Sequence, residues 1–301
     1  MRKQKVALLS IYSNTFLVVL KFAVGFFMGS VSVISEGIHS LLDLMAAIIA
    51  NYSVRRSDIP ADKDHPYGHG KFENYAGVIE AILIVVAAVI IIYEATKKLI
   101  EAAPVEFLYA GIIVMGISAV VNMIVSRKLY RVGIEEDSIA LQADGLHLKT
   151  DVITSLGVFV GLILINFTGL TILDPIVALL VAVIIIKASY DLTREASKGL
   201  VDRRLPEKEE LEIKTILAKH SKMFVGFHDL RTRKSGAHRF VDLHLVMRYD
   251  MKLEEASDVA EHIEKEIEER IKNTRVMVKV ESCDPEDLDF KRIDLTRLNG
   301  H

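Results

Sequence analysis

Six apolar stretches, each long enough to cross a membrane, constrain the fold of this chain more than any other feature. A bilayer core about 30 Å thick needs roughly 20 residues of helix at about 1.5 Å per residue. Inside lipid, a single segment satisfies all its backbone polar groups only as a helix. We therefore expect an all-α six-helix transmembrane domain. Its spans are predicted at residues 6–28, 33–54, 75–96, 107–128, 139–166 and 172–193.

The distribution of Lys and Arg predicts the orientation of these spans. Short loops rich in Lys and Arg stay on the cytoplasmic side of a membrane. Such residues gather before the first span, after the second and after the fourth, whereas the opposite loops carry only Lys97 and Lys98. Because the number of spans is even, both termini are expected in the cytoplasm.

After the last span the sequence becomes that of a small soluble domain. Periodicity predicts a helix at 207–220, strands at 224–232 and 237–247, a helix at 253–272 and a strand at 275–281. This αββαβ order predicts a small α+β, ferredoxin-like domain on the cytoplasmic side. The predicted boundaries are 1–202 for the transmembrane domain, 203–283 for the cytoplasmic domain and 284–301 for a weakly ordered tail.

The second strand of this domain alternates between apolar and polar side chains. Val241, Leu243 and Leu245 are predicted to face the core, while Asp242 and His244 face away from it. The strand therefore offers polar side chains on the face opposite the core.

Two of the apolar spans carry ionisable side chains in the same spacing. His39 and Asp43 lie four residues apart in the second span, and His147 and Asp151 lie four apart in the fifth. That spacing places both side chains of a pair on one helical face. Because an ionisable side chain inside lipid costs about 2.5–3.5 kcal/mol on insertion scales, these residues are candidates for function.

The depths of the two pairs match, because the second and fifth spans run in opposite directions. His39 and Asp43 lie roughly 10 and 16 Å from the outer boundary, and Asp151 and His147 roughly 12 and 18 Å. Asp43 is therefore expected to face His147, and His39 to face Asp151. Two imidazoles and two carboxylates form a tetrahedral set suited to zinc. The alternative is that each pair satisfies itself within its own helix.

Asp144 lies one turn before His147 in the fifth span. Because it is only five residues into the predicted helix, we expect an interfacial charge there. A place on an entry path for metal is the alternative.

Over nearly its whole length the chain resembles the cation diffusion facilitators, a family of metal–proton antiporters. The paired His/Asp motifs on the second and fifth of six spans, followed by a small metal-binding domain, carry this resemblance. It implies that His39, Asp43, His147 and Asp151 form the transport site. It also implies alternating access, a homodimer, zinc as the transported substrate and a possible regulatory ligand, and protons as the counter-ion.

Two details of the sequence bear on which metal is transported and in which membrane the protein lies. The His-x-x-x-Asp form on both spans is similar to the zinc-selective branch, with iron, cobalt, nickel and cadmium as alternatives. The connection at 131–137 lacks the histidine-rich insertion of many eukaryotic vesicular relatives. We therefore expect a prokaryotic inner membrane.

Two further metal sites are implied by the same resemblance. In the second cytoplasmic loop, Asp62, His65 and His69 match a family site, with Asp64 as an alternative to Asp62. Two solvated loop histidines without a metal are the competing interpretation. In the cytoplasmic domain, the matching ligands are His228, His244 and Glu281.

The cytoplasmic site departs from the family pattern at Lys279, where many relatives carry a histidine. A protonated lysine cannot bind a metal and repels a second cation. We therefore expect a single-metal or weakened site, with His262 or Asp242 as a replacement ligand. Alternatively, Lys279 pairs with Glu281 or Asp242 on a solvated face.

Other classes of function find little support in the sequence. The net charge of −3 gives no reason to expect a nucleic-acid partner, and the single cysteine, Cys283, excludes an internal disulfide. An intramembrane metalloenzyme would need a general base beside an open metal site, and no His-Glu-x-x-His motif is present. A membrane-anchored metal sensor or scaffold, acting through the cytoplasmic domain, is the alternative to a transporter.

Overall fold

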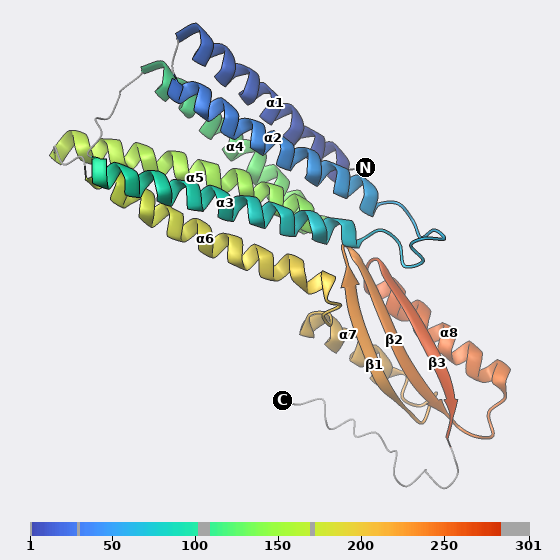
Figure 1. Cartoon of the computed structure of the whole chain (residues 1–301). Coiled ribbons are helices and arrows are strands. Elements are labelled where there is room, and N and C mark those ends of the chain that lie inside the picture. The colour runs from blue at the N-terminus through green and yellow to red at the C-terminus, as the bar shows by residue number, and fades with distance from the viewer. Residues whose placement is uncertain (1, 29–30, 102–108, 169–171, 284–301) are drawn as a thin grey trace. The chain divides into compact units, whose positions relative to one another are not determined.

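The computed structural model describes residues 2–28, 31–101, 109–168 and 172–283. The predicted tail at 284–301 lies outside the described residues. The chain divides into two compact units, Met1–Leu200 and Val201–His301, each with its own internal packing. Figure 1 shows long helices in the first unit and a sheet with two helices in the second.

The first unit contains six long helices within the described residues. They are α1 (Arg2–Met28), α2 (Val31–Ser57), α3 (Lys71–Glu101), α4 (Tyr109–Glu135), α5 (Ile139–Thr168) and α6 (Leu173–Leu200). Each overlaps one predicted span. Five of them, all except α5, contain a described segment that is long and apolar enough to cross a membrane. The N-terminal half of α5 instead carries Asp144, Lys149 and Asp151.

Small side chains allow these helices to approach one another closely. Ala46, Ala47 and Ala50 on α2 and Ala81 and Ala88 on α3 are fully buried. Such small residues are typical of helix interfaces inside membranes. The helices pack chiefly as three pairs, α1 with α2, α3 with α6 and α4 with α5. Further contacts of α5 with α2 and α3 bring the two His/Asp pairs together inside the bundle.

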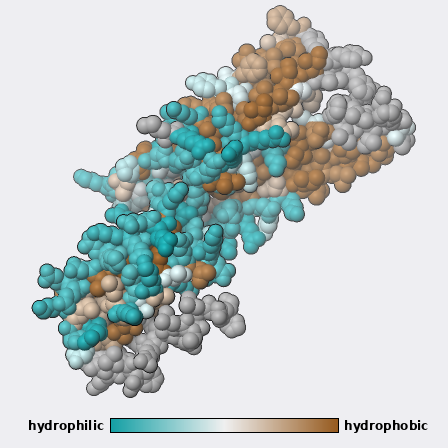
Figure 2. Space-filling view, turned by 180° about the vertical axis from the view of Figure 1, so that it is seen from behind, coloured by the Kyte–Doolittle hydropathy of each residue, from teal (hydrophilic) through white to brown (hydrophobic). Residues whose placement is uncertain are grey.

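The outer surface of the helical unit is apolar. On α3, the side chains of Ile82, Val86, Val89 and Ile90 are all exposed. Figure 2 shows a large apolar area over the helices. An apolar exterior is what a bundle surrounded by hydrocarbon requires.

The second unit has the predicted order of elements. It comprises α7 (Glu207–Lys219), β1 (Gly226–Ser235), β2 (His238–Met247), α8 (Leu253–Arg270) and β3 (Thr274–Ser282). The sheet order is β1-β2-β3, with β2 antiparallel to β1 and parallel to β3. A parallel pair needs a crossover connection, which α8 provides. The strand β1 ends three residues later than predicted, and α8 ends two residues earlier.

One face of this sheet forms the core of the second unit. Val241, Leu243 and Leu245 are at most 1% exposed and belong to one apolar cluster with Ile213 of α7 and Ile263 of α8. The predicted alternation of β2 is thus confirmed. Both helices cover this face, so that the opposite face carries the polar side chains of β1, β2 and β3.

Candidate metal sites

The His/Asp pairs of α2 and α5 face each other across the helix interface. His147 Nε2 lies 3.2 Å from Asp43 Oδ1, and His39 Nε2 lies 3.8 Å from Asp151 Oδ1. These are the cross-helix partners expected from helix direction and depth. His39 Nε2 also lies 3.9 Å from Asp43 Oδ1 within α2, so that Asp43 contacts both histidines.

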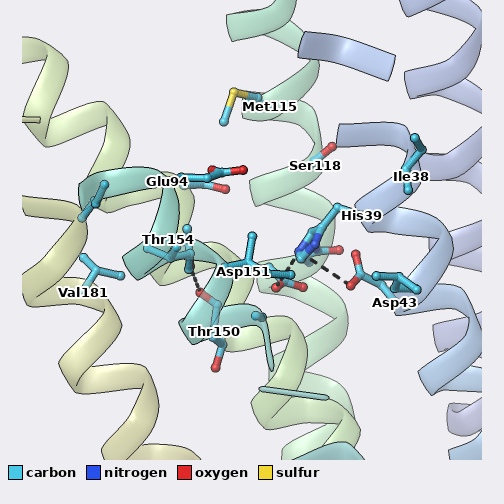
Figure 3. Close-up of a pocket in the computed structure, with 18 of the residues that line it drawn as sticks. Ile38, His39, Asp43, Glu94, Met115, Ser118, Thr150, Asp151, Thr154 and Val181 are labelled. Carbon is cyan, nitrogen blue, oxygen red and sulfur yellow. Dashed lines mark hydrogen bonds and ion pairs between the residues drawn. The ribbon is translucent and has the colours of Figure 1, made fainter. Parts of the chain in front are cut away.

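Three of the four side chains lie close enough together to share one ion. One ligand atom from each of His39, Asp43 and Asp151 lies within 4.8 Å of the other two. Figure 3 shows His39 between the two carboxylates. His147 is joined to this group through Asp43. The arrangement offers imidazole nitrogens and carboxylate oxygens, the ligand types that a divalent metal of the zinc kind accepts.

His39, Asp43 and Asp151 line a cavity of about 380 Å³. Its wall also includes the hydroxyl groups of Ser118, Thr150 and Thr154, as well as Glu94 and Met115 (Figure 3). Glu94 lies near the last residue of α3, and Met115 near the first residue of α4. The cavity therefore extends from the carboxylates toward that end of the bundle. On this side His39 is partly open, with 40% of its side chain exposed, whereas Asp43 is buried.

A buried carboxylate that the sequence analysis missed lies on the other side of His147. Glu80 of α3 is completely buried, and its Oε2 lies 3.7 Å from His147 Nδ1. Within the described residues, neither of its carboxylate oxygens makes a hydrogen bond. The ring of His147 thus lies between Asp43 and Glu80. Glu80 is an acidic residue within the predicted apolar span 75–96. Like Asp43, it could have been recognised from the sequence as a candidate for function.

The side chain of Asp144 is buried among the helices, with only 1% exposed, so that it is not a solvated charge; its position at the membrane boundary stays a prediction. The neighbouring Gly145 lies where α4 and α5 approach each other closely. A Cβ atom at Gly145 would lie 2.8 Å from the backbone nitrogen of Tyr130, so that only glycine permits so close an approach of α4 to α5. The helices enclose the side chain of Asp144, although it is only five residues from the start of α5.

The loop between α2 and α3 brings the three predicted ligands together. Asp62, His65 and His69 form one group, with Asp62 Oδ1 3.5 Å from His65 Nδ1 and Asp62 Oδ2 3.4 Å from His69 Nε2. Gly68, with φ of 81°, allows the turn that returns the chain toward His69. Asp64 is not part of this group; its backbone N–H donates to Asp62 Oδ1.

Hydrogen bonds fix the carboxylate of Asp62 in this loop. The backbone N–H of His65 donates to Asp62 Oδ1 over 2.7 Å and lowers the pKa of that carboxyl below its ordinary value. Asp62 is therefore ionised at neutral pH. The backbone orients it toward the two imidazoles.

The predicted cytoplasmic ligands also lie together, on the face of the sheet opposite its core. His228 and His244 are paired across β1 and β2, and their ring centroids are 5.0 Å apart. Glu281 of β3 lies 2.9 Å from His228 Nε2 and 3.1 Å from His244 Nδ1. Asp229, in the irregular stretch of β1, is a further candidate ligand. One of its carboxylate oxygens lies within 4.8 Å of a ring nitrogen of each of the two histidines.

Lys279 contacts this group directly. Its Nζ lies 2.8 Å from Glu281 Oε1. This contact agrees with the alternative prediction that Lys279 pairs with Glu281. The hydrogen bonds from Lys279 and His228 lower the pKa of Glu281 to about 2. The one glutamate is thus shared by two imidazoles and an ammonium group.

The suggestion that His262 replaces a ligand at this site is wrong. His262 lies on α8, on the core side of the sheet, in a separate group with His220 and Glu266. His228 and His244 lie on the opposite side. Among the described residues, Asp242 belongs to none of these ligand groups.

Comparison with known proteins gives matches over nearly the whole chain. The family described as the cation efflux transmembrane domain matches residues 7–201, and the cytoplasmic domain of cation efflux proteins matches residues 205–283. The uncharacterized transporter sll1263 of Synechocystis sp. is 35% identical over 84% of this chain and 82% of its own length. The cation-efflux pump FieF of Cronobacter sakazakii is 32% identical over 93% of this chain and 92% of its own.

Proposed function

Because the chain belongs to the cation diffusion facilitators, a family of cation efflux transporters and not of enzymes, we propose that it exports zinc in exchange for protons. The coarser function, divalent metal efflux by a multi-pass membrane protein, follows from the family. The choice of zinc, the proton exchange and the residues involved are our proposal.

One observation carries this proposal. Inside the helical unit, His39 faces Asp151 and His147 faces Asp43. Two carboxylates balance the two positive charges of the ion, and two imidazoles complete a four-ligand set. No thiolate takes part, and soft thiolate ligands would favour a more tightly held metal. The set suits an ion that must be released after each transport cycle.

Exchange with protons follows from the chemistry of these ligands. A metal binds to deprotonated imidazole and carboxylate, so that its arrival expels protons and the return of protons releases it. Histidine suits this role because its unperturbed pKa, about 6.5, lies near cytoplasmic pH. The helices would expose the site to the cytoplasm for loading and to the outside for release.

The membrane arrangement is part of the same proposal. All six helices of the first unit cross a bacterial inner membrane, with both termini in the cytoplasm. Residues 1–202 form the transmembrane domain, and residues 203–283 form a ferredoxin-like domain through which two copies associate. Asp144, buried one turn from His147, lies on the path by which metal reaches the site from the cytoplasm.

The sites outside the membrane would bind metal without transporting it. Asp62, His65 and His69 form a loop site. His228, His244 and Glu281 form a regulatory site. It holds at most one ion, because Lys279 forms an ion pair with one carboxylate oxygen of Glu281.

The test is zinc flux into proteoliposomes that contain an internal zinc indicator. Asp151→Asn keeps the size of the side chain but removes its charge, and we expect it to abolish flux. Asp191→Asn, at an exposed position of α6, is the matched control and should transport normally. Normal flux through Asp151→Asn would overturn the assigned site. Flux that ignores an imposed pH gradient would overturn the proton exchange.

A further inference from the structure

A second group of potential ligands occupies the helical side of the cytoplasmic unit. His220 follows the last residue of α7, and His262 and Glu266 lie one turn apart on α8. The rings of His220 and His262 meet edge to face, with centroids 4.9 Å apart. One ligand atom from each of the three residues lies within 4.8 Å of the other two.

The chemistry of this group fits an ion of the zinc type. Two imidazoles and one carboxylate make a three-ligand set that leaves a fourth position for water. Zinc bonds of about 2.0–2.2 Å place neighbouring ligands of a tetrahedral ion about 3.3 Å apart. His262 Nε2 lies 4.0 Å from Glu266 Oε2, and 53% of the His262 side chain is exposed. Because the His262 side chain is largely exposed, its rotation can bring Nε2 closer to Glu266 Oε2.

The positions of all three residues are held by the fold. The backbone N–H of His220 donates to the carbonyl oxygens of Ile216 and Leu217, which end α7. On α8, the fully buried Ile263 and Ile267 each follow one of the two ligand residues and fix the rotation of the helix. Ligands that are held in advance bind an ion at a smaller entropic cost.

Lys219 contacts the same carboxylate but leaves one of its oxygens to the histidines. Its Nζ lies 2.8 Å from Glu266 Oε1, whereas Glu266 Oε2 faces His220 and His262. The lysine therefore competes with an ion for the charge of Glu266 but does not occupy the position between the imidazoles. Removal of this positive charge should strengthen metal binding.

We infer that His220, His262 and Glu266 form a divalent-metal site of the zinc type that links the end of α7 to α8. This site is separate from the transport site and from the group at His228 and His244. It would connect the metal level in the cytoplasm to the packing of the two helices that cover the core of this unit.

The test uses the full chain, purified in detergent and stripped of metal. A background variant first removes ligands from each of the other three groups, so that zinc bound at the new site can be counted. The substitutions in this background are Asp43→Asn, Asp151→Asn, His65→Gln, His69→Gln, His228→Gln and His244→Gln. Equilibrium dialysis with zinc should then find one ion per chain.

The decisive comparison adds one further substitution to that background. His262→Gln removes a ligand from a largely exposed position, and we expect zinc affinity to fall by more than the 10- to 100-fold that loss of an outer-shell partner costs. His238→Gln, at the exposed start of β2, is the matched control and should bind zinc as the background does. Absence of a bound ion in the folded background, or equal affinity in the two variants, would overturn the inference.

A third variant separates a metal site from a purely structural ion pair. Lys219→Met should raise zinc affinity about tenfold, because it removes a positive charge that contacts Glu266 and competes with the ion for that carboxylate. In an ion-pair network without a metal role, the same change would weaken the contact between α7 and α8 and leave zinc affinity unchanged. Unchanged or lower affinity in a variant with normal circular dichroism therefore contradicts the inference.

Discussion

The group of His39, Asp43, His147 and Asp151 in the helical unit and the group at His228 and His244 use the same ligand types but differ in the carboxylates available to each imidazole. Inside the helical unit, Asp43 and Asp151 each face a histidine of the other helix. In the cytoplasmic unit, the single Glu281 contacts two histidines and a lysine. The first group can neutralise a divalent ion, whereas the second already has a positive charge beside its carboxylate.

The two groups also differ in burial. The Asp43 side chain is 5% exposed, whereas that of Glu281 is 31% exposed. Charges away from water interact more strongly, because the effective dielectric constant is lower. Loss of a charge should therefore cost much more in the helical unit than in the cytoplasmic one.

The largest effect on zinc flux is expected from Asp43→Asn, which we compare with Glu281→Gln. The first removes the carboxylate that contacts both His39 and His147, and we expect zinc flux in proteoliposomes to disappear. The second should leave most of the flux intact and reduce zinc binding only at the cytoplasmic unit. Similar losses of flux in both variants would break the distinction between the two groups.

A smaller effect is expected from Glu80→Gln. Because Glu80 contacts the other nitrogen of His147, its removal should weaken the orientation of that ligand and lower zinc affinity by about 10- to 100-fold. The concentration of zinc at half-maximal flux measures this change, with Asp191→Asn as the control. An unchanged half-maximal concentration would show that the ring of His147 is held without Glu80.

Lys279→His should act in the opposite direction, at the cytoplasmic group. It replaces an ammonium that contacts Glu281 with an imidazole that can itself bind a metal. We expect zinc affinity there to rise about tenfold, a gain of roughly 1.4 kcal/mol, while flux through the membrane stays unchanged. Calorimetric titration measures this affinity in a background that carries Asp43→Asn, His65→Gln, His69→Gln and His262→Gln. A weaker site after the substitution would contradict the role assigned to Lys279.

The smallest effect concerns an ion pair with no place in any ligand group. Arg239 binds both carboxylate oxygens of Glu209, at 2.7 and 2.8 Å, and lowers the pKa of that residue. Arg239→Gln should lower the stability of the cytoplasmic unit by about 1 kcal/mol or less and leave zinc flux unchanged.

The pH dependence of this effect has a definite sign. A lowered pKa stabilises the fold above the ordinary carboxyl pKa of 4.5, and the gain is lost as the pH falls through the lowered value. The difference in Tm between wild type and Arg239→Gln should therefore be present at pH 7 and disappear in acid. A difference that grows in acid would contradict this account.

Much of the architecture could be predicted because it rests on local patterns. Span lengths placed all six helices of the first unit, and the alternation of Val241, Leu243 and Leu245 identified the core face of the sheet. The cross-helix pairing of His39 with Asp151 could be predicted as well, because helix direction and rise determine depth. These features need no knowledge of how distant segments pack.

The remaining features depend on packing between elements, which spacing does not reveal. Glu80 lies on a third helix and meets His147 only in the folded bundle. Asp144 is buried among the helices of the bundle, which its distance from the start of α5 does not reveal. His262 faces the end of α7 and not the polar face of the sheet, because α8 packs on the core side.

The most direct test of the central claim is an exchange of ligands between the two helices. His39→Asp and Asp151→His should each lower zinc affinity and flux strongly, whereas the double variant restores two imidazoles and two carboxylates. If these residues hold one ion, the double variant should recover binding and flux well beyond the product of the two single losses. Losses that simply multiply would show that His39 and Asp151 do not share a metal ion.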